Sequence, residues 1–444
     1  MPKITLIGAG SMTFAKNLIG DIISYPELAG AEICLMDINP ERLQMSVQLG
    51  ELLMSQKGGN QCTIFPTTDR RAALKGAHYV ITAFQAGGLK AYEKDIEIPA
   101  KYGVSQCVGD TLNPGGIFRG LRTIPVMQAI AREMAELCPD AVLLQYNNPM
   151  AISTWGTYAS APDLKVVGLC HSVQGTAQML ADWIGAPMEQ VSYRCAGINH
   201  MAWFLEYKWQ GKDAYPLIRE AVKDPVRYGK EPIRIDLLRH FGYFVTESSG
   251  HASEYNPWFR KRPEVLAQTV AKFTDPGHDW LDWGRGGGYL KHCYRELEML
   301  PPRRERWIKG EEPVPFKRSH EYGIQIIHAM ETNTPTTIYG NVRNTGLVTN
   351  LPADACVEVP VLVDGTGLRP IYVGNLPPQL AALNRTNVGA QELAVTGSLL
   401  GDRELVKLAL AMDPLTGAVC SLDEIEAMTR ELFEAHAQWL PQFQ

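Results

Sequence analysis

The sequence predicts an α/β fold in which a doubly wound, Rossmann-type N-terminal sheet is followed by a C-terminal α+β domain. Over the first third of the chain, short β-branched runs alternate with amphipathic helical stretches, as in parallel sheets covered by helices. A glycine-rich turn, Gly8-Ala-Gly10-Ser11, follows the first of these runs and opens a helical stretch. The alternation ends after about residue 190. We therefore expect two domains, 1–190 and 191–444.

The elements of both domains can be placed in order along the chain. Strands of the first domain are predicted at 3–7, 32–36, 78–82, 141–145 and 165–168, with helices at 12–25, from 39–40 onward and at 123–137. Pro40 suits the first turn of a helix, where its missing N–H costs nothing. In the second domain we predict strands at 202–209, 336–339 and 356–359, loops with short helices over 230–310, and a mostly helical last sixty residues.

Composition excludes several classes of protein. Apolar residues make up 45% of the 444 residues and charged residues 20%, so a packed core is feasible. The net charge is -6, and no Lys/Arg cluster long enough to follow a phosphate backbone occurs, so we expect no nucleic-acid partner. No apolar run approaches the roughly 18 residues of a membrane span, and glycines interrupt the N-terminus too early for a signal peptide.

Cysteine usage indicates the compartment. The nine cysteines are an odd number, are scattered along the chain and form no CxxC pair. Such a pattern is not typical of a disulfide framework. We therefore expect a protein of the reducing cytoplasm.

The turn at Gly8 and Gly10 predicts a dinucleotide site. Glycines there permit the tight turn and let the backbone approach a pyrophosphate at the helix N-terminus, next to Ser11. Asp37, at the end of the second predicted strand, can accept both ribose hydroxyls and would repel the extra phosphate of NADP. The alternative is a strand-to-helix turn that merely needs glycine. The order of strand, glycines, helix, strand and acid favours NAD binding.

Two further groups of residues remain open on spacing alone. Asn148 and Cys170 each follow an apolar run, which places them at the edge of the sheet where ligands bind, and His200 follows in Gly197-Ile-Asn-His-Met201. Thiolate and imidazole suit a divalent transition metal, but spacing by itself favours a buried thiol and a core histidine. The polar, aromatic-flanked stretch 244–258 suits a sugar site or an ordinary surface loop.

A series of motifs in fixed order identifies the chain as similar to a known family. After Gly8-Ala-Gly-Ser11 and Asp37 come Asn147-Asn-Pro149, residues 168–176, Ala196–Met201 and Tyr243–Ser249. The whole chain resembles the family 4 glycoside hydrolases, which depend on NAD and a divalent metal. The residues after Cys170, His171-Ser-Val173, resemble the α-galactosidase (melibiase) branch. The resemblance also implies a fold like that of lactate and malate dehydrogenases.

The resemblance implies an α-galactosidase that hydrolyses terminal α-galactosides such as melibiose with retention. In such a reaction NAD takes a hydride from C3 of the sugar, and the resulting ketone acidifies the C2 proton. A base removes that proton, the C1–O bond breaks by elimination, water adds, and the hydride returns to C3. NAD is thereby regenerated in each turnover.

The resemblance also implies a role for each matching residue. Cys170 and His200 would hold Mn²⁺ or another divalent transition metal, and Asn148 would bind the substrate. Tyr255 would be the base, although a phenol needs a nearby cation or metal to act at neutral pH. His171 is expected to be the leaving-group acid. The expected partners are small α-galactosides and further copies of the chain, as a homodimer or homotetramer.

Three rival functions remain on sequence grounds. A 2-hydroxy-acid dehydrogenase would share the first domain but would consume NAD stoichiometrically. A non-catalytic nucleotide sensor would bind NAD but would not need Cys170, His200 and Tyr255 together. A sister α-glycosidase acting on α-glucosides or α-hexuronides is the serious rival, and hydrolysis of matched nitrophenyl glycosides separates it from a galactosidase.

Overall fold

The computed structural model describes residues 1–56, 61–274, 284–319 and 321–444. In the N-terminal half, six parallel strands lie in the order β3-β2-β1-β4-β5-β6, which is the strand order of a Rossmann fold and confirms the predicted class. Their bounds are β1 Lys3–Ile7, β2 Glu32–Met36, β3 Thr63–Thr67, β4 Tyr79–Thr82, β5 Val142–Gln145 and β6 Lys165–Gly168.

The C-terminal strands extend the same sheet with antiparallel pairings. From β6 the order continues β10-β11-β7-β8-β9, with β12 paired to β11. The halves join through the pair Asn341↔Gly168, so strands of both belong to one sheet. A domain boundary at residue 190 stays a prediction. The remaining bounds are β7 Val191–Ile198, β8 Met201–Trp209, β9 Lys212–Asp213, β10 Thr336–Arg343, β11 Cys356–Asp364 and β12 Gly367–Pro370.

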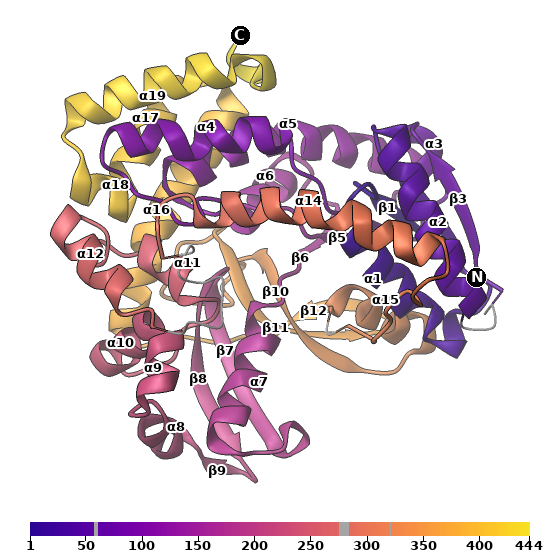
Figure 1. Ribbon diagram of the computed structural model, residues 1–444, viewed down its shortest axis with the longest axis horizontal. Coiled ribbons are helices and arrows are strands. Elements are labelled where there is room, and N and C mark those ends of the chain that lie inside the picture. The colour runs from indigo at the N-terminus through magenta and orange to yellow at the C-terminus, as the bar shows by residue number, and fades with distance from the viewer. Residues whose placement is uncertain (57–60, 275–283, 320) are drawn as a thin grey trace.

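Helices cover both faces of the parallel part, as Figure 1 shows. Helix α5 begins at Asn113, well before the predicted start at residue 123, although Pro-Gly-Gly usually indicates a loop. Pro114 occupies a first-turn position, and a Cβ on Gly115 would lie 2.7 Å from the carbonyl oxygen of Asp95, so close packing requires glycine there. The bounds are α1 Met12–Ile23, α2 Pro40–Gln56, α3 Arg70–Leu74, α4 Gly88–Lys101, α5 Asn113–Leu137, α6 Met150–Ser160 and α7 Ser172–Ile184.

The C-terminal half contains one long helix where the sequence predicts loops and short helices. Helix α14 spans Gly288–Ile308 and includes Pro301 and Pro302. These prolines predict a break, but both are exposed, so water can satisfy the carbonyls that they leave without donors. The other bounds are α8 Tyr215–Ala221, α9 Pro225–Lys230, α10 Pro232–Phe241, α11 Ser249–Glu254, α12 Pro263–Ala271, α15 Tyr322–Thr332, α16 Pro378–Leu400, α17 Arg403–Met412, α18 Pro414–Val419 and α19 Leu422–His436.

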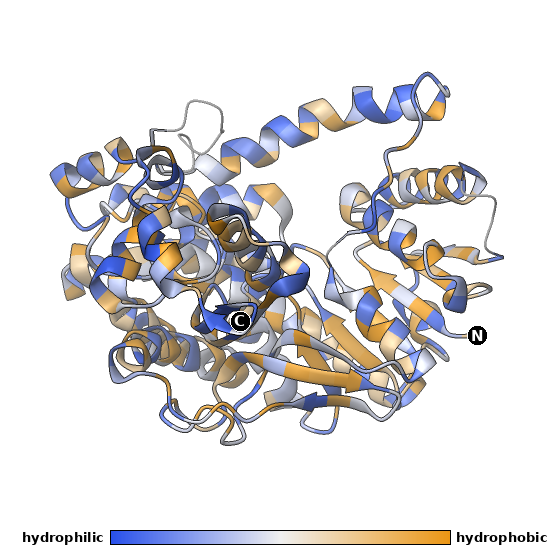
Figure 2. Ribbon diagram, turned by 90° about the horizontal axis from the view of Figure 1, so that it is seen from below, coloured by the Kyte–Doolittle hydropathy of each residue, from blue (hydrophilic) through white to orange (hydrophobic). Residues whose placement is uncertain are grey.

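The core lies along the sheet, whose strands are mostly hydrophobic in Figure 2. The last sixty residues are mostly helical, as predicted, and α16 to α19 pack beside α4 and α5. None of the helices in the described residues combines the length and the apolar character that a membrane span needs.

A buried ion pair fastens the C-terminal helices to the N-terminal half. Arg122 donates to both carboxylate oxygens of Asp95, at 2.8 and 2.6 Å, and His436 Nε2 lies 3.1 Å from Asp95 Oδ1. All three side chains are buried. Burial alone would raise the pKa of Asp95, but the charge of Arg122, its two hydrogen bonds and the adjacent His436 imidazole hold that pKa below its usual value.

Replacing Asp95 with Asn is expected to lower the free energy of unfolding by about 3–5 kcal/mol at pH 7, because it leaves Arg122 as an uncompensated buried charge. Urea unfolding at several pH values measures this difference. Because the folded pKa of Asp95 is lowered, its contribution is complete above the unfolded value of about 4 and is lost as the pH falls through the folded value. The difference in the free energy of unfolding between wild type and variant should therefore become smaller at acid pH. A difference in the free energy of unfolding below about 1 kcal/mol at pH 7 would show that Asp95 and Arg122 do not form a stabilising buried ion pair.

Candidate functional site

The predicted dinucleotide residues come together at the carboxyl ends of β1 and β2. Gly8 has a φ of +91°, and a Cβ on it would lie 2.2 Å from the carbonyl oxygen of Ala83, so only glycine fits. The Gly10 N–H donates to Asp37 Oδ2 at 2.8 Å, and the Asn39 N–H donates to Asp37 Oδ1 at 2.8 Å. Asp37 thus shapes the loop with both oxygens, and each oxygen keeps a second lone pair for a ligand.

Ser11 is the exposed residue that precedes α1, and its hydroxyl does not cap the helix. The first N–H groups of α1 therefore remain available at the mouth of the loop, which is the usual anion site of this turn. Gly8, Gly10, Ser11 and Asp37 are consistent in place with a nucleotide site, and their individual roles stay predictions.

Cys170 and His200, which spacing alone could not pair, are neighbours. Cys170 follows β6 and His200 lies in the turn between β7 and β8 with a φ of +61°. The Cys170 Sγ lies 3.4 Å from His200 Nε2, and Glu247 Oε2 lies 3.6 Å from the same nitrogen. One sulfur, one nitrogen and one oxygen thus face a common point, all within 4.8 Å of one another.

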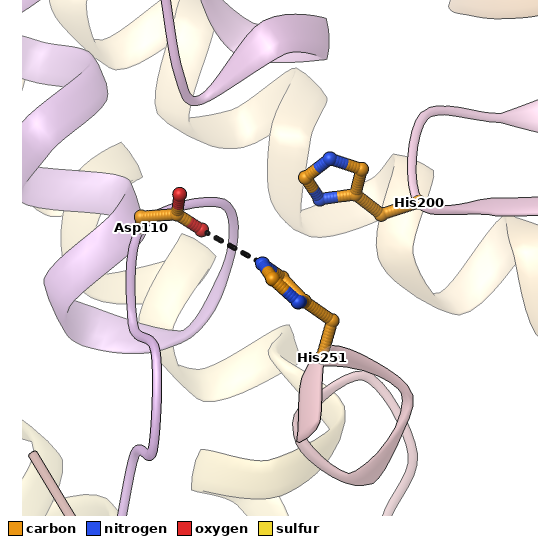
Figure 3. Close-up of side chains that lie close together, drawn as sticks. All are labelled: Asp110, His200 and His251. Atoms are coloured by element: carbon orange, nitrogen blue, oxygen red, sulfur yellow. Dashed lines mark ion pairs between the residues drawn. The ribbon is translucent and has the colours of Figure 1, made fainter. Parts of the chain in front are cut away.

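A second group surrounds the same histidine. Asp110, His200 and His251 also offer ligand atoms within 4.8 Å of one another, and Figure 3 shows Asp110 and His251 facing each other. His251 Nε2 lies 3.5 Å from Asp110 Oδ1, and the Asn148 amide donates to Asp110 Oδ2 at 2.9 Å. The structure therefore places Asn148, predicted to bind substrate, against Asp110, which shares a group with the predicted metal ligand His200.

Asp110 and Glu247 were not identified from the sequence. Asp110 lies in the loop before α5, far from the other motifs along the chain, and its side chain is not marked by any periodic pattern. Glu247 falls inside the quoted motif Tyr243–Ser249, so that motif pointed to it without showing its role.

Tyr255 is buried on the far side of the His200 ring from Cys170. Its hydroxyl lies 3.1 Å from His200 Nδ1, and the hydroxyl of Thr111 lies 3.1 Å from the same nitrogen. Burial and the carboxylates of Asp110 and Glu254 raise the pKa of the Tyr255 phenol. The cation that the phenol needs to act as a base is therefore not supplied by these neighbours, and a metal at His200 would supply it.

His171 is adjacent to Cys170 but faces outward. Its side chain is 72% exposed, and its Nδ1 lies 3.7 Å from Glu321 Oε1. Exposure is compatible with proton exchange with water. Its assignment as the leaving-group acid stays a prediction.

The donor set fits a divalent transition metal. Burial raises the pKa of the Cys170 thiol to about 12, with Glu247 adding to the shift, so the protein alone keeps this sulfur protonated. A metal that displaces the proton would bind a thiolate, an imidazole and a carboxylate, which together suit Mn²⁺ through Zn²⁺. For Glu247, burial opposes ionisation, but the charges of His200 and His251 lower its pKa, so a carboxylate is ready in the group.

Two family descriptions match consecutive parts of the chain. Residues 3–186 match the family 4 glycosyl hydrolase model, and residues 195–416 match the family 4 glycosyl hydrolase C-terminal domain. The chain belongs to glycosyl hydrolase family 4. This confirms the family that the motifs identified, and it excludes the hydroxy-acid dehydrogenase and the non-catalytic sensor.

This family 4 enzyme aligns with its relatives over nearly all of its length. It is 42% identical to an α-galactosidase of Bacillus subtilis (strain 168), over 100% of both chains. It is 39% identical to an α-galactosidase of Rhizobium meliloti (strain 1021), over 99% of this chain and 89% of the relative. Its fold matches the Thermotoga maritima 6-phospho-β-glucosidase, solved with manganese, NAD⁺ and glucose-6-phosphate, with a TM-score of 0.80, 20% identity and coverage of 98% and 99%.

Proposed function

We propose that this family 4 glycosyl hydrolase is an NAD- and Mn²⁺-dependent α-galactosidase. The observation that carries the proposal is the Cys170–His200–Glu247 group beside Asn148 and Tyr255, in a chain aligned over its full length with α-galactosidases. The donor set supports the metal, and the glycine turn with Asp37 supports NAD.

The two cofactors supply chemistry that side chains cannot. When bound, NAD supplies reversible oxidation at C3 of the sugar, and the metal supplies a Lewis acid at the neighbouring oxygens. Gly8 and Gly10 let the backbone approach the pyrophosphate, and Asp37 receives the ribose hydroxyls. Cys170, His200 and Glu247 would hold the metal.

The remaining site residues hold the sugar and move its protons. The Asn148 amide, fixed by Asp110, presents its carbonyl oxygen for a sugar hydroxyl. The Tyr255 oxygen removes the C2 proton, and the Nδ1–H of His200 can donate a hydrogen bond to that oxygen when Nε2 is bound to metal. This hydrogen bond favours the phenolate and fixes the position of the base.

Matched nitrophenyl glycosides test the function. With NAD, Mn²⁺ and a reductant present, the α-galactoside should be hydrolysed with a higher kcat/KM than the α-glucoside or the α-galacturonide. Catalytic amounts of NAD should suffice, and no net NADH should form. Faster hydrolysis of either rival glycoside would mean that the protein is a sister α-glycosidase. Formation of one NADH per substrate consumed would refute hydrolysis by this route.

Replacing Asp37 with Ala is expected to weaken NAD binding by on the order of 1–3 kcal/mol, the scale of lost hydrogen bonds to a charged group. The variant loses the ribose acceptor and also the contact that holds the Gly10 N–H. Isothermal titration with NAD measures the effect. Glu41→Ala, on the exposed first turn of α2, is the matched control and should bind NAD normally. Unchanged affinity in the Asp37 variant would show that the ribose contact is wrong.

A further inference from the structure

Arg119 is a buried cation of which only some hydrogen-bond donors have a partner within the residues that the structure describes. It lies on α5 with 9% of its surface exposed, and its Nε donates to the backbone oxygen of Asn148 at 3.1 Å. Its guanidinium carbon lies 5.6 Å from the centre of the Tyr92 ring. Its Nη1 is shielded from solvent and has no hydrogen-bond partner among the described residues.

This partial use sets Arg119 apart from the other buried arginines of the chain. Each of those donates to at least two residues, whereas Arg119, within the described ranges, donates only to Asn148: the acceptors are Asp95 and Ala86 for Arg122, Glu231 and Thr176 for Arg234, and Ser105, Ser253 and Gly284 for Arg260. In the described part of the chain, no carboxylate forms an ion pair with Arg119. A buried charge with an unused donor is costly, so its presence calls for a function.

Asn148 connects Arg119 directly to the candidate site. The backbone oxygen of Asn148 accepts from Arg119, while its side-chain amide donates to Asp110 Oδ2 at 2.9 Å. Asp110 belongs to the group that includes His200 and His251. The Arg119 guanidinium therefore lies one residue away from the Asn148 side chain, and its charge also lowers the pKa of Asp110.

We propose that Arg119 determines the sugar specificity of the site, with Nη1 donating a hydrogen bond to the oxygen at C4 or C6 of the glycone. The inference rests on the proposed function, in which C1, C2 and C3 are the reacting carbons. The oxygens at C4 and C6 are then the ones left for side chains to recognise. A guanidinium has donors only, so it needs an acceptor oxygen, and the C4 oxygen is the one that distinguishes galactosides from glucosides.

Deoxy substrates test this contact one oxygen at a time. Wild type and Arg119→Met, both loaded with NAD and Mn²⁺, are compared on nitrophenyl α-galactoside and on its 4-deoxy and 6-deoxy analogues. On the parent substrate the variant should lose about 10- to 100-fold in kcat/KM, the scale of a hydrogen bond to a charged group. On the analogue that lacks the contacted oxygen it should lose little, because the wild type has already lost that bond.

The controls separate the proposal from folding and from the proposed function. Arg70→Met removes a guanidinium that donates to Glu133 at the other end of α5, about 20 Å along the helix. This control should leave the ratio of kcat/KM between the parent galactoside and each deoxy analogue unchanged. If circular dichroism shows that Arg119→Met does not fold, Arg119→Lys, which keeps the charge, is taken through the same comparison. Equal losses on the parent and on both analogues would overturn the contact. A folded wild type that hydrolyses none of the galactosides would instead refute the proposed function.

Discussion

Replacing His200 with Ala is expected to abolish Mn²⁺-dependent hydrolysis without unfolding the protein. His200 is shared by both groups of candidate metal ligands, so its loss leaves neither group complete. The expected loss is on the order of 10³-fold or more in kcat, since a Lewis acid contributes several kcal/mol to the transition state. Activity, metal content after dialysis against Mn²⁺, and circular dichroism measure the three parts of this expectation.

Cys170→Ser should behave like His200→Ala, because a serine hydroxyl is a poor substitute for a thiolate ligand. Cys420→Ser is the matched control, since Cys420 follows α18 and bonds the backbone of Tyr102, outside both metal groups. EDTA should abolish the hydrolytic activity of the wild type, and added Mn²⁺ should restore that activity. Oxidation should inactivate the enzyme and dithiothreitol should reverse the loss. Full activity in EDTA would rule out the metal site.

The parallel strands could be predicted because their signals are local. Apolar runs bounded by glycine or polar residues predicted β1, β2 and β6 with the bounds that the structure has. Strand β3 was missed because Pro66 interrupts its run and several of its side chains are exposed. It is an edge strand, where proline is tolerated since one side of the strand needs no partner.

The candidate site was harder to predict because its parts are distant in sequence. Cys170 and His200 could be paired only through the family resemblance, and folding brings them within 3.4 Å by placing β6 and β7 in one sheet. Asp110 and Arg119 carry no periodic or motif signal, and their importance emerges from the residues that they meet in three dimensions. Propensity and spacing do not encode such contacts.

Replacing Tyr255 with Phe is expected to lower kcat by roughly 10²–10⁴-fold, the usual scale for a missing general base. The change removes one oxygen from a side chain that is 2% exposed, so packing should survive and thermal unfolding should change little. The structure also excludes one alternative candidate for the base, Glu254. Both carboxylate oxygens of Glu254 accept backbone N–H groups, from Val108 at 2.8 Å and Gly109 at 3.1 Å, so that side chain is committed to holding the loop.

Isotopes test whether the C2 proton is removed, and the Tyr255→Phe variant tests whether the Tyr255 oxygen removes it. Substrate deuterated at C2 should show a primary isotope effect in the wild type, and product formed in D₂O should carry deuterium at C2, because the abstracted proton exchanges with solvent before water adds. Near-normal turnover in Tyr255→Phe would indicate that His251 is the base instead. Its Nε2 lies 3.5 Å from Asp110 Oδ1, and its ring packs against the ring of His200. If no solvent deuterium enters at C2, the elimination route itself is wrong, because a direct displacement at C1 never breaks the C2–H bond.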